Sequence, residues 1–400
     1  MNLTPDEQAM LDGAHGRAAQ KAMQILVALG TIYHAPRLIP VTSVQIAGVS
    51  YDNLGEAGLQ FLAEMADGGG RVRVKATLNP AGMDIENWPA LGILPDFAEK
   101  QMLVIDAFAR MGVETSCTCT PYLIGNLPAY GDHIAWSESS AVCYANAVLG
   151  ARSNREGGPS ALAAALTGHT PEYGMHLDEN RYPGLTVNVI ARLQENTDFG
   201  ALGKAIGEKI QAAKIIPYIT GIDSASLEQL KSFCASLATY GGAALFHIPG
   251  LTPEASLYKP PAESLTITQA NLDDANRSLS DATEAEVDFV SLGCPHLTLA
   301  EIARIAALLD GKQVTREFWI TTARPIKEIA DRLGYTQIIT VAGAKIAADT
   351  CCVVAPIGGR FTALAADSAK ACYYASGKNN FKTLFLPFED VVRLAIQVRD

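Results

Sequence analysis

Short apolar runs and longer amphipathic segments alternate along the chain. Residues 71–75 read Arg-Val-Arg-Val-Lys, which is the alternating period of a strand with one solvent-exposed face. Segments with apolar residues at helical spacing follow most of these runs. The expected strands are 42–47, 71–77, 113–118, 185–191, 215–219 and 243–248, and the expected helices are 4–29, 54–66, 97–111, 202–210 and 227–240. This alternation predicts an α/β fold with mostly parallel sheets.

In the last third of the chain, apolar runs stop at corners rich in glycine, proline and cysteine. The runs are 287–292, 318–320 and 338–341. The first ends in Gly-Cys-Pro-His at 293–296, and a later corner reads Ala-Asp-Thr-Cys-Cys at 348–352. Far upstream, 116–122 reads Ser-Cys-Thr-Cys-Thr-Pro-Tyr. Because functional side chains of parallel sheets lie past the carboxyl ends of strands, three corners with thiols favour a buried metal cluster.

The spacing of these cysteines indicates three ligands. Cys117 and Cys119 face the same side of a strand, and the adjacent Cys351 and Cys352 face opposite sides. One cysteine of each pair, together with Cys294, makes three thiolates. Three are too few for a closed zinc site but suit a cubane iron–sulfur cluster with one open iron, which is a Lewis acid. The alternative is ordinary buried thiols, which we expect for Cys143 and Cys234, and nothing in the spacing of Cys372 demands a ligand.

Between residues 121 and 181 the pattern changes to polar loops and small-residue helices. The loop 150–158 carries Arg152 and Arg155 among glycines, just before an expected helix at 159–166. Backbone N–H groups at helix starts and guanidinium groups bind anions, although a surface loop with ordinary salt bridges has the same composition. A proline-rich linker ends near 261. We therefore expect lobes at 1–120 and 121–260, which can interleave, and a C-terminal α/β lobe at 261–400.

Composition narrows the class of protein. The 400 residues are 48% hydrophobic and carry a formal charge of −11, which argues against a nucleic-acid groove. A small anionic substrate is compatible with this charge, because a few converging arginines bind one. We see neither a signal peptide nor an apolar run long enough to cross a membrane. With eight unevenly spaced cysteines, a reducing cytoplasm is the expected compartment.

Several motifs of this sequence together resemble the aconitase X family in its stand-alone large subunit. The motifs are Cys-Thr-Pro-Tyr at 119–122, Gly-Asp-His-Ile-Ala-Trp-Ser-Glu-Ser at 131–139, Ala-Asn-Ala-Val-Leu-Gly-Ala-Arg at 145–152, Asn-Arg-Glu-Gly-Gly at 154–158, Gly-Cys-Pro-His at 293–296 and Asp-Thr-Cys at 349–351. The resemblance extends from the first helix to Ser-Ala-Lys at 368–370 and so covers essentially the whole chain. It implies a hydro-lyase on the aconitase-type catalytic fold, with several α/β lobes around a central iron–sulfur site.

The resemblance also implies the cofactor ligands and a partner. The matching frames select Cys119, Cys294 and Cys351 as ligands of a [4Fe–4S] cluster, with a [2Fe–2S] cluster as the alternative. A small swivelling domain closes over the site in aconitase-like enzymes and brings the serine that removes a proton. We expect that domain on a separate small subunit, which forms a heterodimer or a larger assembly with this chain.

Two substrates are implied by the family. One member reaction dehydrates mevalonate 5-phosphate to anhydromevalonate phosphate for isoprenoid synthesis, and the other dehydrates cis-3-hydroxy-L-proline. Cys294 and the stretches 122–126 and 154–158 look more like the phosphomevalonate branch. Arg152 and Arg155 would then hold the phosphate or carboxylate, and Asn154 is a further expected substrate-binding residue. From a different class, the chain could be a non-catalytic binding or scaffold subunit with merely buried thiols.

The remaining site predictions concern corner residues. In the expected reaction a base takes the C2 proton, and His133 or His296 protonates the departing hydroxide. Glu138 is a further catalytic candidate, although a lone histidine or carboxylate is as often structural. Ser50, Asn79 and Ser137 are expected in the substrate shell because they sit at corners, with turn or cap chemistry as the alternative for each.

Overall fold

The computed structural model describes residues 1–211 and 215–396. Its first lobe is built on a parallel sheet. The strand order is β4-β3-β2-β5, and a separate antiparallel pair joins β1 to β6. The strands are β1 (Leu38–Pro40), β2 (Ser43–Ile46), β3 (Lys75–Leu78), β4 (Glu114–Cys117), β5 (Ala135–Trp136) and β6 (His169–Pro171). The helices are α1 (Pro5–Leu11), α2 (Arg17–Ile32), α3 (Tyr51–Asp67), α4 (Pro95–Arg110) and α6 (Gly158–Thr167). Apolar faces of α2, α3, α4 and α6 share one core with this sheet.

The middle lobe has a smaller parallel sheet with the order β8-β7-β9. Its elements are β7 (Leu185–Val189), α7 (Asn196–Ile210), β8 (Pro217–Thr220), α8 (Leu227–Gly241), β9 (Ser264–Ile267) and α9 (Gln269–Ser278). The helix α5 (Ser139–Tyr144), continued by a π-helical turn at Ala145–Leu149, packs into the same core. The expected strand at 243–248 is wrong, because only His247 bridges to Tyr218 there.

The C-terminal lobe has a five-stranded parallel sheet with the order β12-β11-β10-β13-β14. Its strands are β10 (Phe289–Leu297), β11 (Glu317–Thr322), β12 (Lys345–Ala348), β13 (Ala363–Ala366) and β14 (Lys382–Phe385). Its helices are α10 (Leu299–Leu309), α11 (Arg324–Arg332), α12 (Tyr335–Val341), α13 (Ala369–Asn379) and α14 (Phe388–Ile396). The apolar run 338–341 is thus part of a helix, and the strand follows it. Short 3₁₀ turns lie at Trp88–Leu91, Pro121–Leu123, Gly174–His176, Asp178–Asn180 and Ala255–Leu257.

Strand pairing crosses the expected lobe boundaries near residues 120 and 260. Strand β5 pairs with β2 and β1 pairs with β6, so the first lobe continues well past residue 120. Strand β9 pairs with β7, so residues just after 261 belong to the middle lobe. The expected helix 4–29 is divided into α1 and α2, because Gly13 and Gly16 between them adopt φ values of +92° and +94°.

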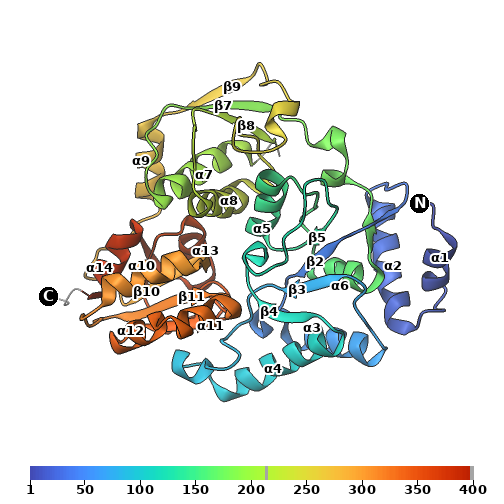
Figure 1. Ribbon diagram of the computed structural model, residues 1–400, viewed down its shortest axis with the longest axis horizontal. Helices are drawn as coiled ribbons and strands as arrows, with labels where there is room; N and C mark the ends of the chain where they lie inside the picture. Colours follow the sequence, from blue (N-terminus) through green and yellow to red (C-terminus); the bar gives the residue numbers. More distant parts are fainter. Residues whose placement is uncertain (212–214, 397–400) are drawn as a thin grey trace.

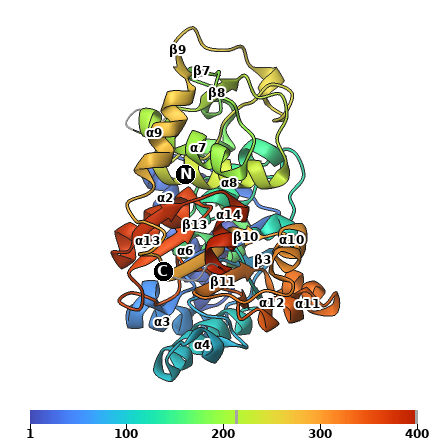
Figure 2. The same ribbon diagram turned by 90° about the vertical axis from the view of Figure 1, so that its left-hand side faces the viewer.

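The carboxyl ends of the first and third sheets face each other at the centre of the molecule. The N–H of Ala81 donates to the carbonyl of Asp349 at 2.7 Å, and the N–H of Ala348 donates to the Asp84 carboxylate at 2.8 Å. The middle lobe completes the arrangement, with the C-terminal lobe on the left and the first lobe on the right in Figure 1. Figure 2 shows the middle lobe above both. None of the described helices has the length and apolarity needed to span a bilayer.

Candidate active site

Three cysteines from separate corners meet where the lobes converge. Cys119 follows β4, Cys294 lies within β10 after its pairing with β11 shifts register, and Cys351 follows β12. Burial raises the pKa of the Cys119 thiol well above its ordinary value, and nearby Glu138, Cys351 and Cys294 raise it further. Burial and then Cys351 raise the pKa of Cys294 to about 12. Cys119 therefore lies near Cys294 and Cys351, and Cys294 lies near Cys351, so the three sulfurs share one site.

Hydrogen-bond donors point at each of these sulfurs. The backbone N–H of His296 donates to Cys119 Sγ at 3.2 Å. The N–H groups of Val353 and Val354 donate hydrogen bonds to Cys351, and the hydroxyl of Ser368 donates one to Cys294. Each of these hydrogen bonds lowers the pKa of its thiol and so opposes the effect of burial. Donors directed at sulfur stabilise the thiolate form, which is the form that binds metal.

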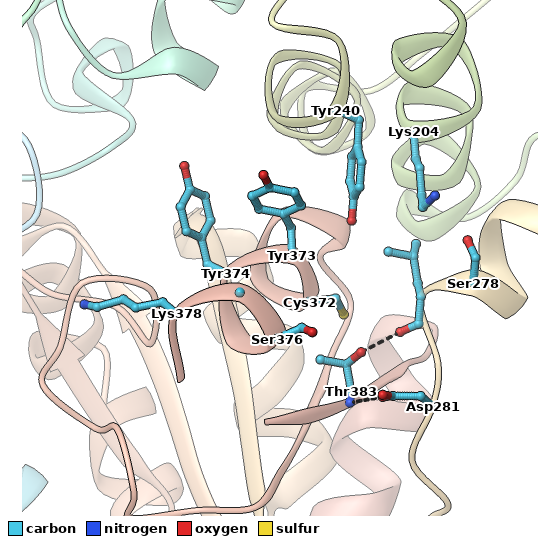
Figure 3. A pocket seen from close by; sticks show the side chains of 12 residues that line it. Lys204, Tyr240, Ser278, Asp281, Cys372, Tyr373, Tyr374, Ser376, Lys378 and Thr383 are labelled. Atoms are coloured by element: carbon cyan, nitrogen blue, oxygen red, sulfur yellow. Dashed lines mark hydrogen bonds between the residues drawn. The ribbon is translucent and has the colours of Figure 1, made fainter. Parts of the chain in front are cut away.

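The other five cysteines differ in how near they lie to these three. Burial raises the pKa of the Cys117 thiol. The nearby charges that act on this pKa are those of Asp349 and Arg324 and not those of the three thiols, although Cys117 is only two residues from Cys119. Cys143 and Cys234 contact each other in the core of the middle lobe. Cys372 lines a separate cavity of about 650 Å³ between α8, α13 and β14, together with Tyr240 and Thr383 (Figure 3). Cys352 neighbours Cys351 and Cys294 and packs into an apolar cluster formed by the first and C-terminal lobes.

A buried ion pair lies beside the thiols. Lys370, in the first turn of α13, bonds through its ammonium to the carboxylate of Glu138, which caps α5. Burial would raise the pKa of the Glu138 carboxyl, but the charge of Lys370, the N–H of Ser140 and the amide of Asn79 together lower it to about 2. Burial would lower the pKa of Lys370, but Glu138 raises it above its ordinary value. Both groups are therefore charged at neutral pH.

The predicted shell residues of the first lobe lie around this pair. Asn79 Nδ2 donates to Glu138 Oε2 at 2.9 Å, while its buried Oδ1 has no partner among the described residues. The buried hydroxyl of Ser137 is likewise unpartnered in the described ranges. The hydroxyl of Ser50 donates to the carbonyl of Val354 at 3.0 Å and so joins the first lobe to the corner of Cys351.

His296 is fully buried between the corners. Its Nδ1 lies 2.9 Å from the hydroxyl of Thr118, and its Nε2 lies 2.9 Å from the carbonyl oxygen of Thr350. Lys231 of α8 donates to the carbonyl of His296 at 3.0 Å and pairs with Glu301 at 2.6 Å. Burial lowers the pKa of the His296 ring to about 4, so the ring is neutral at neutral pH.

A second group of predicted residues lies in the first lobe without a recorded contact to the thiols in the described part of the chain. His133 Nδ1 lies 3.0 Å from His176 Nδ1, and Arg152 bonds to the carbonyl of His176 and to Asp178. The amide of Asn154 is engaged by the backbone of Tyr173 and Met175, at 3.0 and 2.8 Å. Arg155 lines a cavity of about 840 Å³ with Asn154 and neighbouring residues. His133, Arg152 and Asn154 therefore bond to neighbouring protein groups, whereas Arg155 faces the cavity.

Sequence reasoning missed Lys370, Lys231 and Thr118. Lys370 belongs to the Ser-Ala-Lys stretch at the end of the resemblance, directly after a strand, and a lysine at such a corner is a detectable signal. Lys231 and Thr118 carry no such signal, because one lies on an amphipathic helix and the other is an unremarkable threonine between two cysteines.

Family models match most of this chain. Three family models match in order: Aconitase X first domain at residues 1–179, second domain at 183–277 and third domain at 287–397. The chain belongs to the aconitase X family. A solved structure described as Thermococcus kodakaraensis aconitase X (holo-form) superposes with a TM-score of 0.92 at 43% identity, covering 99% of this chain and 100% of that one. The predicted aconitase-type α/β fold is therefore confirmed.

Named aconitase X relatives fall into two groups. "Phosphomevalonate dehydratase large subunit" of Methanothermobacter thermautotrophicus is 45% identical over 97% of this chain and 97% of its own length. The protein of the same name from Methanosarcina mazei is 44% identical over 99% of this chain and 97% of its own. "Cis-3-hydroxy-L-proline dehydratase" of Pseudomonas aeruginosa is 34% identical over 98% of this chain, which spans 69% of its length.

The donor set of this aconitase X chain fits an iron–sulfur cluster better than a lone ion. Within residues 1–211 and 215–396, no three His, Cys, Asp or Glu side chains are arranged to hold a single metal ion. Thiolates that bind a cluster attach to different irons and need not converge on one point. The buried Thr350 hydroxyl beside Cys351 has no partner among the described residues, so it is available to a bound group.

Proposed function

We propose that this protein is the large subunit of a hydro-lyase that dehydrates mevalonate 5-phosphate to anhydromevalonate phosphate. The observation that carries the proposal is the identity of 44–45% over 97–99% of the chain to relatives named phosphomevalonate dehydratase large subunit. The relatives named for cis-3-hydroxy-L-proline are at 34% and are longer. In the proposed reaction the C2–H and C3–O bonds break, a carbon–carbon double bond forms, and water leaves.

Cys119, Cys294 and Cys351 would hold the iron–sulfur cluster that the family implies. Three protein thiolates leave one iron of a [4Fe–4S] cube without a protein ligand, which favours that cluster over [2Fe–2S]. When bound, such a cluster supplies a Lewis acid for a substrate hydroxyl. The buried thiols have raised pKa values, so binding must release their protons, and the donors at each sulfur favour that release.

The chain's own charged residues would orient the substrate. Among the described residues the Lys370 ammonium bonds to Glu138 and Ser139, which leaves one hydrogen for an anionic group such as the carboxylate. The unpartnered Oδ1 of Asn79 is an acceptor and suits a substrate hydroxyl. Glu138 is ionised, so it holds Lys370 and Asn79 in place and does not donate a proton.

Other predicted roles have less support. Arg155, which lines the cavity of about 840 Å³, stays the candidate for the phosphate, because Arg152 and Asn154 bond to neighbouring protein groups. Proton donation to the departing hydroxide stays a prediction for His133, and Ser137 and Ser50 stay predicted shell residues.

A partner subunit would complete the enzyme. The words "large subunit" in the name of the relatives support the existence of a small subunit. This chain also spans only 65% and 69% of the length of the two cis-3-hydroxy-L-proline dehydratases. We place the swivelling domain and its serine base on that small subunit, and the assembly in the cytoplasm. A small subunit that closes over the converging corners would also exclude water from the charged site.

The test is anaerobic co-expression with the small subunit, followed by assay of both substrates. We expect bound iron and sulfide and dehydration of mevalonate 5-phosphate, with both lost in Cys119→Ala. Preferential turnover of cis-3-hydroxy-L-proline would select the alternative substrate. A colourless anaerobic preparation without iron and without turnover would leave a non-catalytic scaffold subunit, and the proposal would be wrong.

A further inference from the structure

We propose that His296 is a positioning residue that locks the three cysteine corners to one another and is not the proton donor of the reaction. This inference rests on the proposed iron–sulfur function. It concerns a histidine that lies two residues after Cys294 and touches the corners of the other two thiols.

The hydrogen bonds assign the state of the ring. A carbonyl oxygen only accepts, so His296 Nε2 carries the hydrogen and donates to Thr350 across 2.9 Å. In a neutral ring Nδ1 is then the acceptor, and the Thr118 hydroxyl donates to it across 2.9 Å. The Thr118 oxygen in turn accepts the N–H of Thr120 at 3.1 Å, which is consistent with its hydrogen pointing at the ring.

Every polar atom of His296 is engaged, and the partners come from all three lobes. Its N–H reaches Cys119 Sγ of the first lobe, and its ring nitrogens reach the residues just before Cys119 and Cys351. Its carbonyl accepts from Lys231 of the middle lobe at 3.0 Å. One buried residue therefore joins all three lobes at the thiols, and its ring keeps no hydrogen for a substrate.

A residue with these contacts sets where the sulfurs lie. The ring spans from the Cys119 corner to the Cys351 corner, and its own segment carries Cys294. Partners that orient metal ligands change metal affinity by about 10–100-fold when removed. Loss of the His296 ring should therefore loosen cluster binding, even though the ring is not a ligand.

The experiment uses the anaerobically reconstituted large and small subunits together. His296→Gln keeps a donor but cannot span both corners, and Thr118→Val removes only the hydroxyl that donates to Nδ1. The matched control is His247→Gln, which alters another fully buried histidine whose Nε2 bonds to the carbonyl of Arg181 in the middle lobe. The readout is the rate at which an iron chelator bleaches the cluster absorbance, with circular dichroism as the check of folding.

We expect bleaching to be faster by on the order of tenfold in His296→Gln and in the same direction in Thr118→Val, with the control within about twofold of wild type. If His296→Gln does not fold, Thr118→Val decides. Wild-type bleaching rates in both variants, with turnover lost, would make His296 a catalytic residue and overturn the proposal. Equal bleaching in the His247 control would also overturn it. A wild-type complex without iron would instead refute the proposed function itself.

Discussion

Replacing Lys370 by methionine removes one half of the buried ion pair beside the thiols. The Lys370 and Glu138 side chains are 8% and 11% exposed, so water cannot solvate the carboxylate that remains. Methionine nearly keeps the volume of lysine, and the change is therefore mainly one of charge. The N–H of Ser140 and the amide of Asn79 are the remaining donors to Glu138.

The magnitude follows from the pKa of Glu138. The fold lowers this pKa from 4.5 to about 2, and each unit corresponds to about 1.4 kcal/mol, so the ionised carboxylate is stabilised by about 3 kcal/mol. Removal of one partner from a buried pair typically costs about 3–5 kcal/mol, which agrees. We therefore expect Lys370→Met to lower the free energy of unfolding by about 3–5 kcal/mol at pH 7.

The assay is urea denaturation of the metal-free chain under reducing, anaerobic conditions, combined in a double-mutant cycle with Glu138→Gln. The double variant should recover most of the loss, because it leaves no buried charge unpaired. Lys378→Met is the matched control on the same helix, since Lys378 pairs with Asp52 at 27% and 37% exposure. An exposed pair should contribute about 0–1 kcal/mol.

Two results would refute this reasoning. One is a loss in Lys370→Met no larger than in Lys378→Met, which would mean that the Glu138 site is solvated. The other is a double variant whose loss equals the sum of the single losses, because a directly interacting pair must be non-additive. Burial dominates once Lys370 is gone, so the pKa of Glu138 should rise. The variant should then gain stability relative to wild type as the pH falls from 7 toward the ordinary value of 4.5.

Three further predictions follow from single positions. Acid should destabilise the wild type progressively between pH 4.5 and pH 2, because the pKa of Glu138 is lowered to about 2 and its contribution to the free energy of unfolding is complete only above pH 4.5. The midpoint of urea denaturation, measured as a function of pH, checks this. Cys119→Ala should abolish bound iron while Cys117→Ala keeps it, by iron analysis of anaerobic protein, since only Cys119 senses the other two thiols. Gly293→Ala should destabilise the chain and lose iron, because φ is +113° and a Cβ would lie 2.2 Å from a backbone oxygen; Gly311→Ala, at +70° in open space, should cost only about 1–2 kcal/mol by thermal unfolding.

Much of the architecture could be predicted from the sequence because it depends on the local spacing of apolar and polar residues. Alternating strands and helices indicated parallel sheets, and the corners at the strand ends carried the cysteines that converge. Local patterns did not predict the element where intrinsic strand preference and tertiary packing favour different structures. The apolar run 338–341 has the residues of a strand, but α12 buries one side of it against α10 and leaves Val341 exposed. The extent of the first sheet could not be predicted because strand pairing is non-local: β5 completes a sheet begun some ninety residues earlier.

The sequence by itself determined which corners bear chemistry, since a thiol, a glycine and a proline at a strand end are properties of neighbouring residues. Only the tertiary structure decided which thiols of distant corners lie close together, because side-chain direction at a corner depends on how two sheets meet. It separated Cys119 from Cys117, and it placed Glu138 against Lys370 from the opposite end of the chain. It also brought both ring nitrogens of His296 into contact with residues far away in the sequence, and these contacts are the basis of the proposed positioning role.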